Sequence, residues 1–138
     1  MSFDVYLQSF HNGELAGIPR QRVRDAFGTH LTEIGPDDWQ LRYDDANSCD
    51  LDLMGDDTDA AMVLGFTVYR PCSDQRLWDG LASILASGDV VLYFPGGRAP
   101  LVARSTVTDH LPASMVEALG QPVVVASDRE IQREIHAA

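Results

Sequence analysis

The sequence predicts one α+β domain over residues 1–138, with a mixed β-sheet that is antiparallel in its N-terminal part and contains a βαβ unit over residues 63–94. Two apolar runs of strand length that enclose a segment of helical periodicity indicate the βαβ unit. Two short segments within residues 39–53 alternate apolar and polar side chains, which is typical of an antiparallel hairpin. Further helical patterns bring the expected total to about four helices flanking the sheet.

The N-terminal segment predicts a strand and a short helix. Residues 3–10 alternate loosely, and the Asn-Gly pair at 12–13 marks a turn. Residues 19–28 are typical of a helix because they begin with proline and end with glycine. Three arginines of this helix are expected to form a solvated face that balances the acidic part of the chain at a distance: Arg20, Arg22 and Arg24.

The predicted hairpin has its turn at residues 44–48. Matching the apolar faces of its two strands places Tyr43 opposite Cys49 and Arg42 opposite Asp50. Cys49 therefore points toward the interior, and the hairpin presents a polar face to solvent.

The predicted βαβ unit follows a loop over residues 55–61. Pro71 ends its first strand by removing a backbone donor. Ser73 is the expected N-cap of the helix, and Gly88 is expected to end the helix in the left-handed conformation. Trp78 lies on the apolar stripe of this helix and should be buried.

The second strand of the unit, residues 90–94, is continuously apolar and is predicted to be the centre of the sheet. Because a helix connects it to the first strand, the two strands should be parallel and joined by a right-handed crossover. Their carboxyl ends then lie on one edge of the sheet.

The C-terminal third predicts a strand near residues 101–103, a helix from Pro112 to Gly120 and a buried strand at residues 123–125. Ser127, followed by Glu130 three residues later, has the pattern of a capping box and predicts the start of the last helix.

The net charge of −11 is concentrated in one window. Residues 37–59 contain nine aspartates and only one cation, Arg42, so this window carries −8 of the total. Such a field opposes binding to nucleic acids and to anionic membranes, and it favours a basic protein partner. The expected partner-binding residues are the aspartates around the hairpin: Asp44, Asp45, Asp50, Asp52, Asp56, Asp57 and Asp59.

Several chemistries lack the residues they need. The chain contains no lysine, which excludes a Walker-type phosphate lysine and a pyridoxal phosphate Schiff base. Residues 50–61 fail as a calcium loop, and Cys49 and Cys72 have no zinc spacing. We therefore expect no catalytic residues, no metal and no cofactor. We also expect two reduced, separate thiols in a cytoplasmic protein, since neither a secretory signal nor an apolar membrane span is present.

A second interpretation places a small-anion site, or an enzyme site for an anion, at the carboxyl edge of the two strands of the βαβ unit. Glycine amides, an arginine and the start of the helix could hold an anion there. The residues concerned are Arg70, Cys72, Ser73, Gly96, Gly97 and Arg98.

Three segments carry a resemblance: Thr67-Val-Tyr-Arg-Pro-Cys72, Val91-Leu-Tyr-Phe-Pro-Gly96 and Pro122-Val-Val-Val-Ala-Ser127. They resemble short signatures of small uncharacterised bacterial proteins, some of the immunity-protein type that neutralise a sibling toxin. The resemblance implies a binding role without catalysis. Together with the confined acidic surface, it leads us to expect a non-enzymatic acidic protein-binding module, such as an immunity-type inhibitor of a basic toxin.

Overall fold

The computed structural model describes residues 3–94 and 99–136. Its strands are β1 (Val5–His11), β2 (Glu14–Leu15), β3 (Ile18–Pro19), β4 (Leu31–Glu33), β5 (Asp38–Asp44), β6 (Asn47–Asp56), β7 (Asp59–Tyr69), β8 (Val90–Tyr93), β9 (Leu101–Val102) and β10 (Val123–Val124). Its helices are α1 (Arg20–Phe27), α2 (Gln75–Ala86), α3 (Ala113–Leu119) and α4 (Asp128–His136), with 3₁₀ turns η1 (Gly28–His30) and η2 (Ser105–His110).

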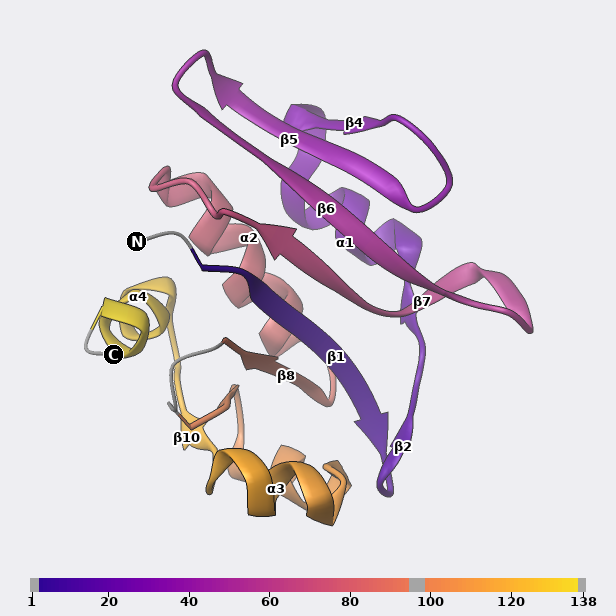
Figure 1. Cartoon of the computed structure of the whole chain (residues 1–138), viewed down its shortest axis with the longest axis vertical. Coiled ribbons are helices and arrows are strands. Elements are labelled where there is room, and N and C mark those ends of the chain that lie inside the picture. Colours follow the sequence, from indigo (N-terminus) through magenta and orange to yellow (C-terminus); the bar gives the residue numbers. More distant parts are fainter. Residues whose placement is uncertain (1–2, 95–98, 137–138) are drawn as a thin grey trace.

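The strands form one sheet with the order β10-β9-β8-β1-β7-β6-β5-β4, while β2 pairs with β1 and β3 pairs with β7 (Figure 1). Among the described strands, β9 and β10 pair in parallel, and the other neighbours are antiparallel. The α+β class and the mixed sheet are therefore confirmed.

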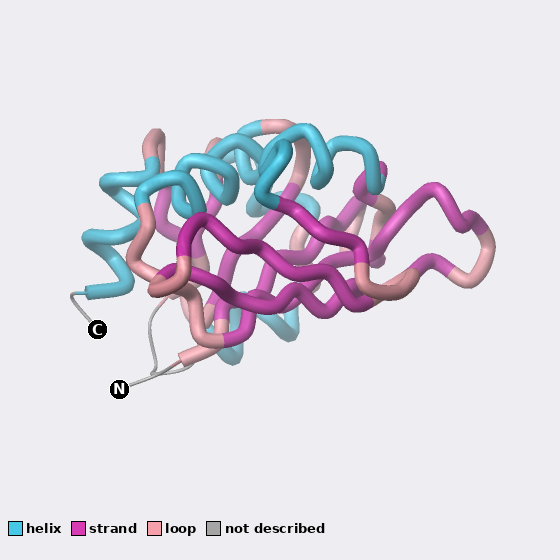
Figure 2. Tube along the Cα trace, turned by 90° about the horizontal axis from the view of Figure 1, so that it is seen from above, coloured by secondary structure: helices cyan, strands magenta, loops and turns pink. Residues whose placement is uncertain are grey.

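Helices cover the two faces of the sheet unequally. The main core joins α1, α2 and α4 to one face, where Leu7, Leu51 and Phe66 are buried. A second, smaller core packs η2 and α3 on the opposite face, but only over the end of the sheet that carries Val91 and Val102. Figure 2 shows the resulting layers, with most helices on one side of the strands. Within the described residues, no helix has the length and apolarity needed to cross a bilayer.

The βαβ unit is present, but its two strands are not neighbours. β1 lies between β7 and β8 and is antiparallel to both, so β7 and β8 run in the same direction without hydrogen bonding to each other (Figure 1). The expectation that β8 forms the centre of the sheet is thus corrected, since β1 occupies the position between the two strands. The apolar residues of β1 alternate toward the main core, and this pattern gave no indication of its partners.

Helix α2 begins and ends differently from the prediction. Asp74, not Ser73, is the N-cap, and its side chain accepts a hydrogen bond from the amide of Arg76. The helix ends at Ala86 with Ser87 as its C-cap, and Gly88 does not adopt a positive φ. Trp78 is buried as predicted, with 3% of its surface exposed, and its indole N–H donates to the carbonyl of Cys72 at 3.2 Å.

The β5–β6 hairpin has the predicted faces but a different register. Leu41, not Tyr43, lies opposite Cys49, and Gln40, not Arg42, lies opposite Asp50. Two local features cause this shift. The side chain of Asp44 accepts hydrogen bonds from the amides of residues 46 and 47, which tightens the turn, and a bulge falls between residues 42 and 44. Because the shift is two residues, each side chain stays on its predicted face.

The expected loop over residues 55–61 is instead the end of a long hairpin. β6 continues to Asp56 and β7 begins at Asp59, so the turn is reduced to Asp57 and Thr58. Asp56 closes this turn by accepting hydrogen bonds from the amide and the hydroxyl of Thr58. The hairpin tip extends beyond the rest of the sheet (Figure 2).

The predicted elements at the two ends of the chain are largely confirmed. Asn12 and Gly13 form the turn after β1, both with positive φ. α1 lies between Pro19 and Gly28, and α3 between Pro112 and Gly120. The strand at residues 123–125 is shorter than expected and only partly buried, whereas α4 has its apolar stripe in the core.

Candidate functional site: an acidic sheet face with tyrosines

Away from α1 and α2, the side of β5, β6, β7 and the first part of β1 is not covered by any of the described helices. On the same side, η2 and α3 cover the other end of the sheet, around Phe10 and Val91, and reach the edge of Tyr93. Directly paired residues share a face of a sheet, so the pairing defines the residues on this side. Asp50 pairs with Tyr69, Asp52 with Thr67 and Tyr6 with Tyr93. We call the whole group the open face: Tyr6, Gln8, Asp38, Gln40, Asp50, Asp52, Met54, Gly65, Thr67, Tyr69 and Tyr93.

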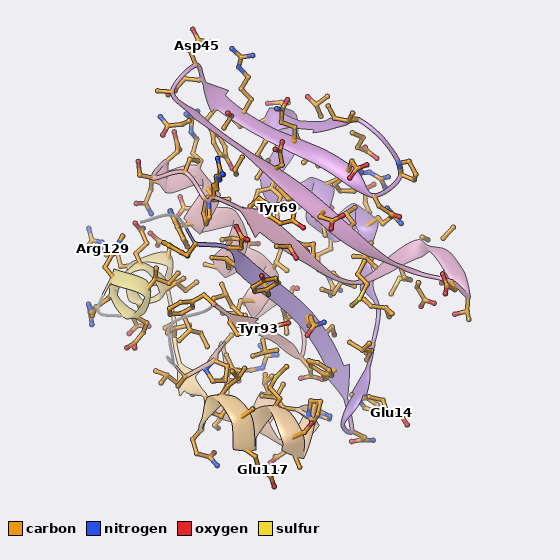
Figure 3. All side chains as sticks on the ribbon, in the orientation of Figure 1. Glu14, Asp45, Tyr69, Tyr93, Glu117 and Arg129 are labelled. Atoms are coloured by element: carbon orange, nitrogen blue, oxygen red, sulfur yellow. The ribbon has the colours of Figure 1, made fainter. Side chains whose placement is uncertain are left out.

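Three tyrosines line the open face. Tyr6 and Tyr93 stack with ring centroids 5.2 Å apart and an interplanar angle of 16°, and the hydroxyl of Tyr93 donates to Gln8 at 2.9 Å. Tyr69 is 41% exposed, and its hydroxyl donates to the carboxylate of Asp52 at 3.2 Å. In Figure 3 the labelled Tyr69 and Tyr93 both lie over the middle of the sheet. The tyrosines therefore offer rigid aromatic surface with a polar edge, a common property of protein-binding sites.

Two adjoining depressions shape the open face. One, of about 320 Å³, lies over β1 and β7 around Tyr6 and Gly65, and the other, of about 450 Å³, lies over β5 and β6 beside Tyr69. Asp52 borders both depressions. Gly65 leaves its position without a side chain, and a Cβ there would come within 2.4 Å of the carbonyl oxygen of Leu7. The first depression thus depends on the close approach of β1 to a glycine.

Carboxylates surround the tyrosines. Proximity to the Asp52 carboxylate raises the pKa of Tyr69, with smaller contributions from burial and from Asp4. Asp4 precedes β1 and accepts a hydrogen bond from the amide of Arg70 at 3.2 Å. The cation on β5, Arg42, forms its ion pair with Asp45 in the adjacent turn. The carboxylates of the face and its edge are Asp4, Asp38, Asp50 and Asp52.

The aspartates predicted to bind a partner do not form one patch. β6 is a strand of 10 residues, which corresponds to roughly 30 Å between its two turns. Asp44 and Asp45 lie at one turn, and the residues of the other turn lie at the opposite end of the strand. In Figure 3 the label of Asp45 marks the tip of the β5–β6 hairpin, far from Tyr93. Of the seven, the open face holds Asp50 and Asp52.

Three of these seven aspartates have local structural roles. Hydrogen bonds from the side chain of Asn47 hold the pKa of Asp44 below its ordinary value, and Thr58 does the same for Asp56. Asp59 accepts a hydrogen bond from the amide of residue 61. Their carboxylates are explained by the turns they stabilise. Sequence reasoning missed the tyrosines. Tyr6 and Tyr69 fall on the polar side of the alternation in β1 and β7, which could have placed them on an outward face.

The arginines of α1 also differ from the expectation of a solvated face. The side chain of Arg20 is only 13% exposed, and its guanidinium donates to the carbonyls of residues 36 and 60 and to Asp37 at 3.0 Å. Arg24 forms an ion pair with Glu33 at 2.9 Å and lies over the ring of Trp39. These two arginines attach α1 to the edge of the sheet, and Arg20 neutralises one carboxylate of the acidic window directly.

The alternative anion site is only partly within the described residues. Gly96, Gly97 and Arg98 lie outside them. Arg70 and Cys72 do follow the end of β7, where the prediction placed them. The same edge carries two carboxylates, because Asp4 binds the amide of Arg70 and Asp74 caps α2 and pairs with Arg76 at 2.9 Å. Those carboxylates repel an anion, and the side chain of Asp74 already accepts a hydrogen bond from an amide in the first turn of α2.

The two thiols are free, as expected, with Cys49 buried and Cys72 partly exposed. Burial raises the pKa of Cys49 to about 12, and interaction with the thiol of Cys72 contributes to the shift. Cys72 also packs against the main core. A thiol with a raised pKa is a poor nucleophile, so Cys49 does not offer covalent catalysis.

Comparison with protein-family models, with curated proteins and with solved structures found no match for this chain. The open face therefore provides the main indication of function. It combines aromatic surface, negative charge and shallow relief, which suits contact with another macromolecule more than enclosure of a small substrate.

Proposed function

We propose that the protein is a non-enzymatic binding module that acts in the cytoplasm and uses the open face to bind a basic protein, in the manner of an immunity-type inhibitor of a basic toxin. The observation that carries this proposal is the position of Asp50 and Asp52 beside the exposed Tyr69, on the part of the sheet that none of the described helices covers.

The chemistry of this group fits a partner rich in arginine. Tyrosine and arginine are enriched at the centres of protein interfaces, and a guanidinium can stack on a tyrosine ring while it donates to a neighbouring carboxylate. Asp52 already accepts one hydrogen bond from Tyr69, which orients its carboxylate. The two depressions on either side of Asp52 leave room for side chains of the partner.

The remaining aspartates support the same partner without contacting it closely. Asp45 and Asp57 lie at the two tips of β6, where their charges extend the negative field around the open face. Long-range charge of this kind increases the rate of association, whereas contacts at the interface centre determine the rate of dissociation. The proposal thus assigns different roles to the tips and to the face.

The test begins with the genes that neighbour the one for this chain, where the proposal predicts a basic toxin, and continues with that toxin as the binding partner. We expect a one-to-one complex that suppresses the toxin, and we expect Tyr69→Ala combined with Asp52→Asn to lower the affinity by about 100-fold or more, mainly through faster dissociation. The control is Tyr93→Phe, which removes one hydroxyl from the same face and keeps the aromatic stack. A gene neighbourhood of metabolic enzymes, or a complex that the double variant leaves unchanged, would contradict the proposal.

A further inference from the structure

Three potential metal ligands converge at the end of the sheet near the turn between β1 and β2. His11 is the last residue of β1, Asp89 immediately precedes β8, and His110 is the last residue of η2. One ligand atom from each residue lies within 4.8 Å of the others. Residues separated by 78 and 21 positions along the chain thus meet at one place, which no spacing motif in the sequence indicates.

Backbone hydrogen bonds fix the three segments that carry these side chains. The amide of Phe10 donates to the carbonyl of Asp89 at 3.1 Å, which joins the end of β1 to the start of β8. The amide of Gly13 donates to the carbonyl of His110 at 2.8 Å, which joins the β1–β2 turn to η2. The ligand positions therefore belong to rigid, mutually bonded elements, the condition under which a site is preorganised.

The side chains themselves also face one another. The two imidazole rings lie nearly parallel, with centroids 5.0 Å apart and an interplanar angle of 17°. Nε2 of His110 is 3.7 Å from Oδ2 of Asp89, and Nε2 of His11 is 3.3 Å from the amide nitrogen of the Asn12 side chain. Small rotations about χ1 and χ2 would bring the three ligand atoms to the separation of about 3.3 Å that tetrahedral coordination requires.

We propose that His11, Asp89 and His110 bind a divalent transition-metal ion, with Zn²⁺ as the best-suited member of the series. Two imidazoles and one carboxylate are a donor set typical of zinc and related ions, whereas calcium and magnesium select sites built from oxygen alone. Three protein ligands leave a coordination position for water. The site lies at the end of β1 that joins β2, outside the open face, and its proposal is independent of the function proposed for that face.

The hydrogen bond of His110 makes the proposal specific. The amide of Asn12 donates to Nδ1 of His110 at 3.2 Å, so the proton of the neutral ring is on Nε2 and faces Asp89. A metal at Nε2 moves that proton to Nδ1, which can then no longer accept from the amide. The amide is exposed, so water can replace the lost acceptor. Metal binding should therefore release the Asn12 amide.

Arg104 is the cation closest to the site among the described ion pairs. Its guanidinium is 3.9 Å from Oδ1 of Asp89, and it also donates to the carbonyls of Ala86 and Gly88. These bonds hold the arginine on the Oδ1 side of the carboxylate, so Oδ2 stays available to the metal. The positive charge lowers the affinity of the site, and it also orients the carboxylate.

The experiment titrates Zn²⁺ and Co²⁺ into the metal-free, untagged full chain and follows binding by calorimetry. We expect one ion per chain, a dissociation constant of the order of 1 to 10 μM, and a rise of several degrees in melting temperature at a hundredfold excess over that constant. Co²⁺ should give the visible absorption of a low-symmetry nitrogen and oxygen site. In nuclear magnetic resonance spectra, Zn²⁺ should shift the imidazole nitrogens of both histidines and speed hydrogen exchange of the Asn12 amide.

The variants separate this site from other potential ligands. His11→Gln and Asp89→Asn should each weaken binding at least about 10-fold and leave the fold intact, since both side chains are at least partly exposed. His136→Gln and Cys72→Ser are the matched controls, because they remove a histidine and a thiol elsewhere and should leave binding unchanged. Equal affinity in His11→Gln, loss of binding in Cys72→Ser, or an Asn12 amide unaffected by Zn²⁺ would overturn the proposal.

Discussion

The two faces of the central strands differ in what they do for the protein. On the covered face, Leu7, Leu51 and Phe66 pack against α1, α2 and α4 and hold the fold together. On the open face, the same strands alternate to Tyr6, Asp52 and other polar or aromatic residues, which lie on the side away from α1 and α2. Closely spaced carboxylates on a sheet repel one another and add nothing to packing. The covered face therefore supplies stability, and the proposed function assigns binding to the other face.

The largest expected effect is on the covered face. Trp78→Ala should lower the free energy of unfolding by about 3 to 5 kcal/mol, because it removes a buried indole and leaves a cavity. Tyr69→Ala, the matched change on the open face, should cost less than about 1 kcal/mol, since that ring is exposed. Chemical denaturation of both variants measures the difference. Similar losses in the free energy of unfolding for the two variants would contradict the claim that only the covered face stabilises the fold.

A smaller loss is expected for Gly65→Ala, a change on the open face that acts through the backbone. The added Cβ would meet the carbonyl oxygen of Leu7 at 2.4 Å, so β1 and β7 would have to separate. We expect a cost of about 1 to 3 kcal/mol by thermal denaturation, with partial filling of the depression around Tyr6. Unchanged stability would show that β1 and β7 can separate at Gly65 at no cost in free energy. The close approach of β1 to Gly65 would then not explain the depression.

Trp78 and Gly65 illustrate what the sequence can and cannot predict. The stripe that contains Trp78 has helical spacing and points to one face, so α2 and its buried side were predictable from a local pattern. Gly65 gave no such signal, because its role depends on β1, a strand that joins β7 from the other end of the chain. Which strand inserts between β7 and β8 is a non-local choice, and local periodicity does not contain it.

The candidate site was predictable only in part, for related reasons. The alternation that places Asp50 and Asp52 on a polar face was visible, and a register shift of two residues preserved it. The turns that separate the other aspartates depend on side-chain hydrogen bonds such as that of Asp44 to Asn47. The exposure of Tyr69 depends on which face the helices cover, and only tertiary packing determines that.

A moderate, pH-dependent effect is expected at the cap of α2 on the covered side. The hydrogen bond with the side chain of Arg76 lowers the pKa of Asp74 to about 2 from its ordinary value of 3.8. Because the pKa is lower in the folded state, the stabilisation is present above pH 4 and is lost as the pH falls toward 2. Asp74→Asn keeps the capping oxygen and removes the charge, so it should melt below the wild type at pH 6, and most of this difference should be lost near pH 2. A difference as large at pH 2 as at pH 6 would refute the assignment.

The smallest effect on stability is expected for charges of the open face. Asp50→Asn combined with Asp52→Asn should raise the melting temperature by about 1 to 2 °C at low salt, because it relieves repulsion, and the gain should disappear at high salt. Asp56→Ala should instead lower the melting temperature, since it removes the Oδ1 atom that accepts both hydrogen bonds of the Thr58 turn. Thermal melts at two salt concentrations distinguish the two cases. A lower melting temperature for the first variant would assign the face carboxylates a structural role.

The most direct measurement of the proposed division of roles compares two double variants that have the same net charge. One combines Asp50→Asn with Asp52→Asn, and the other combines Asp45→Asn with Asp57→Asn. Each removes two negative charges, the first from the open face and the second from the hairpin tips. Stopped-flow kinetics with the basic toxin should show that both pairs slow association at low salt. Only the face pair should also accelerate dissociation, by about 10-fold or more. Equal dissociation rates for the two pairs would contradict binding through the open face.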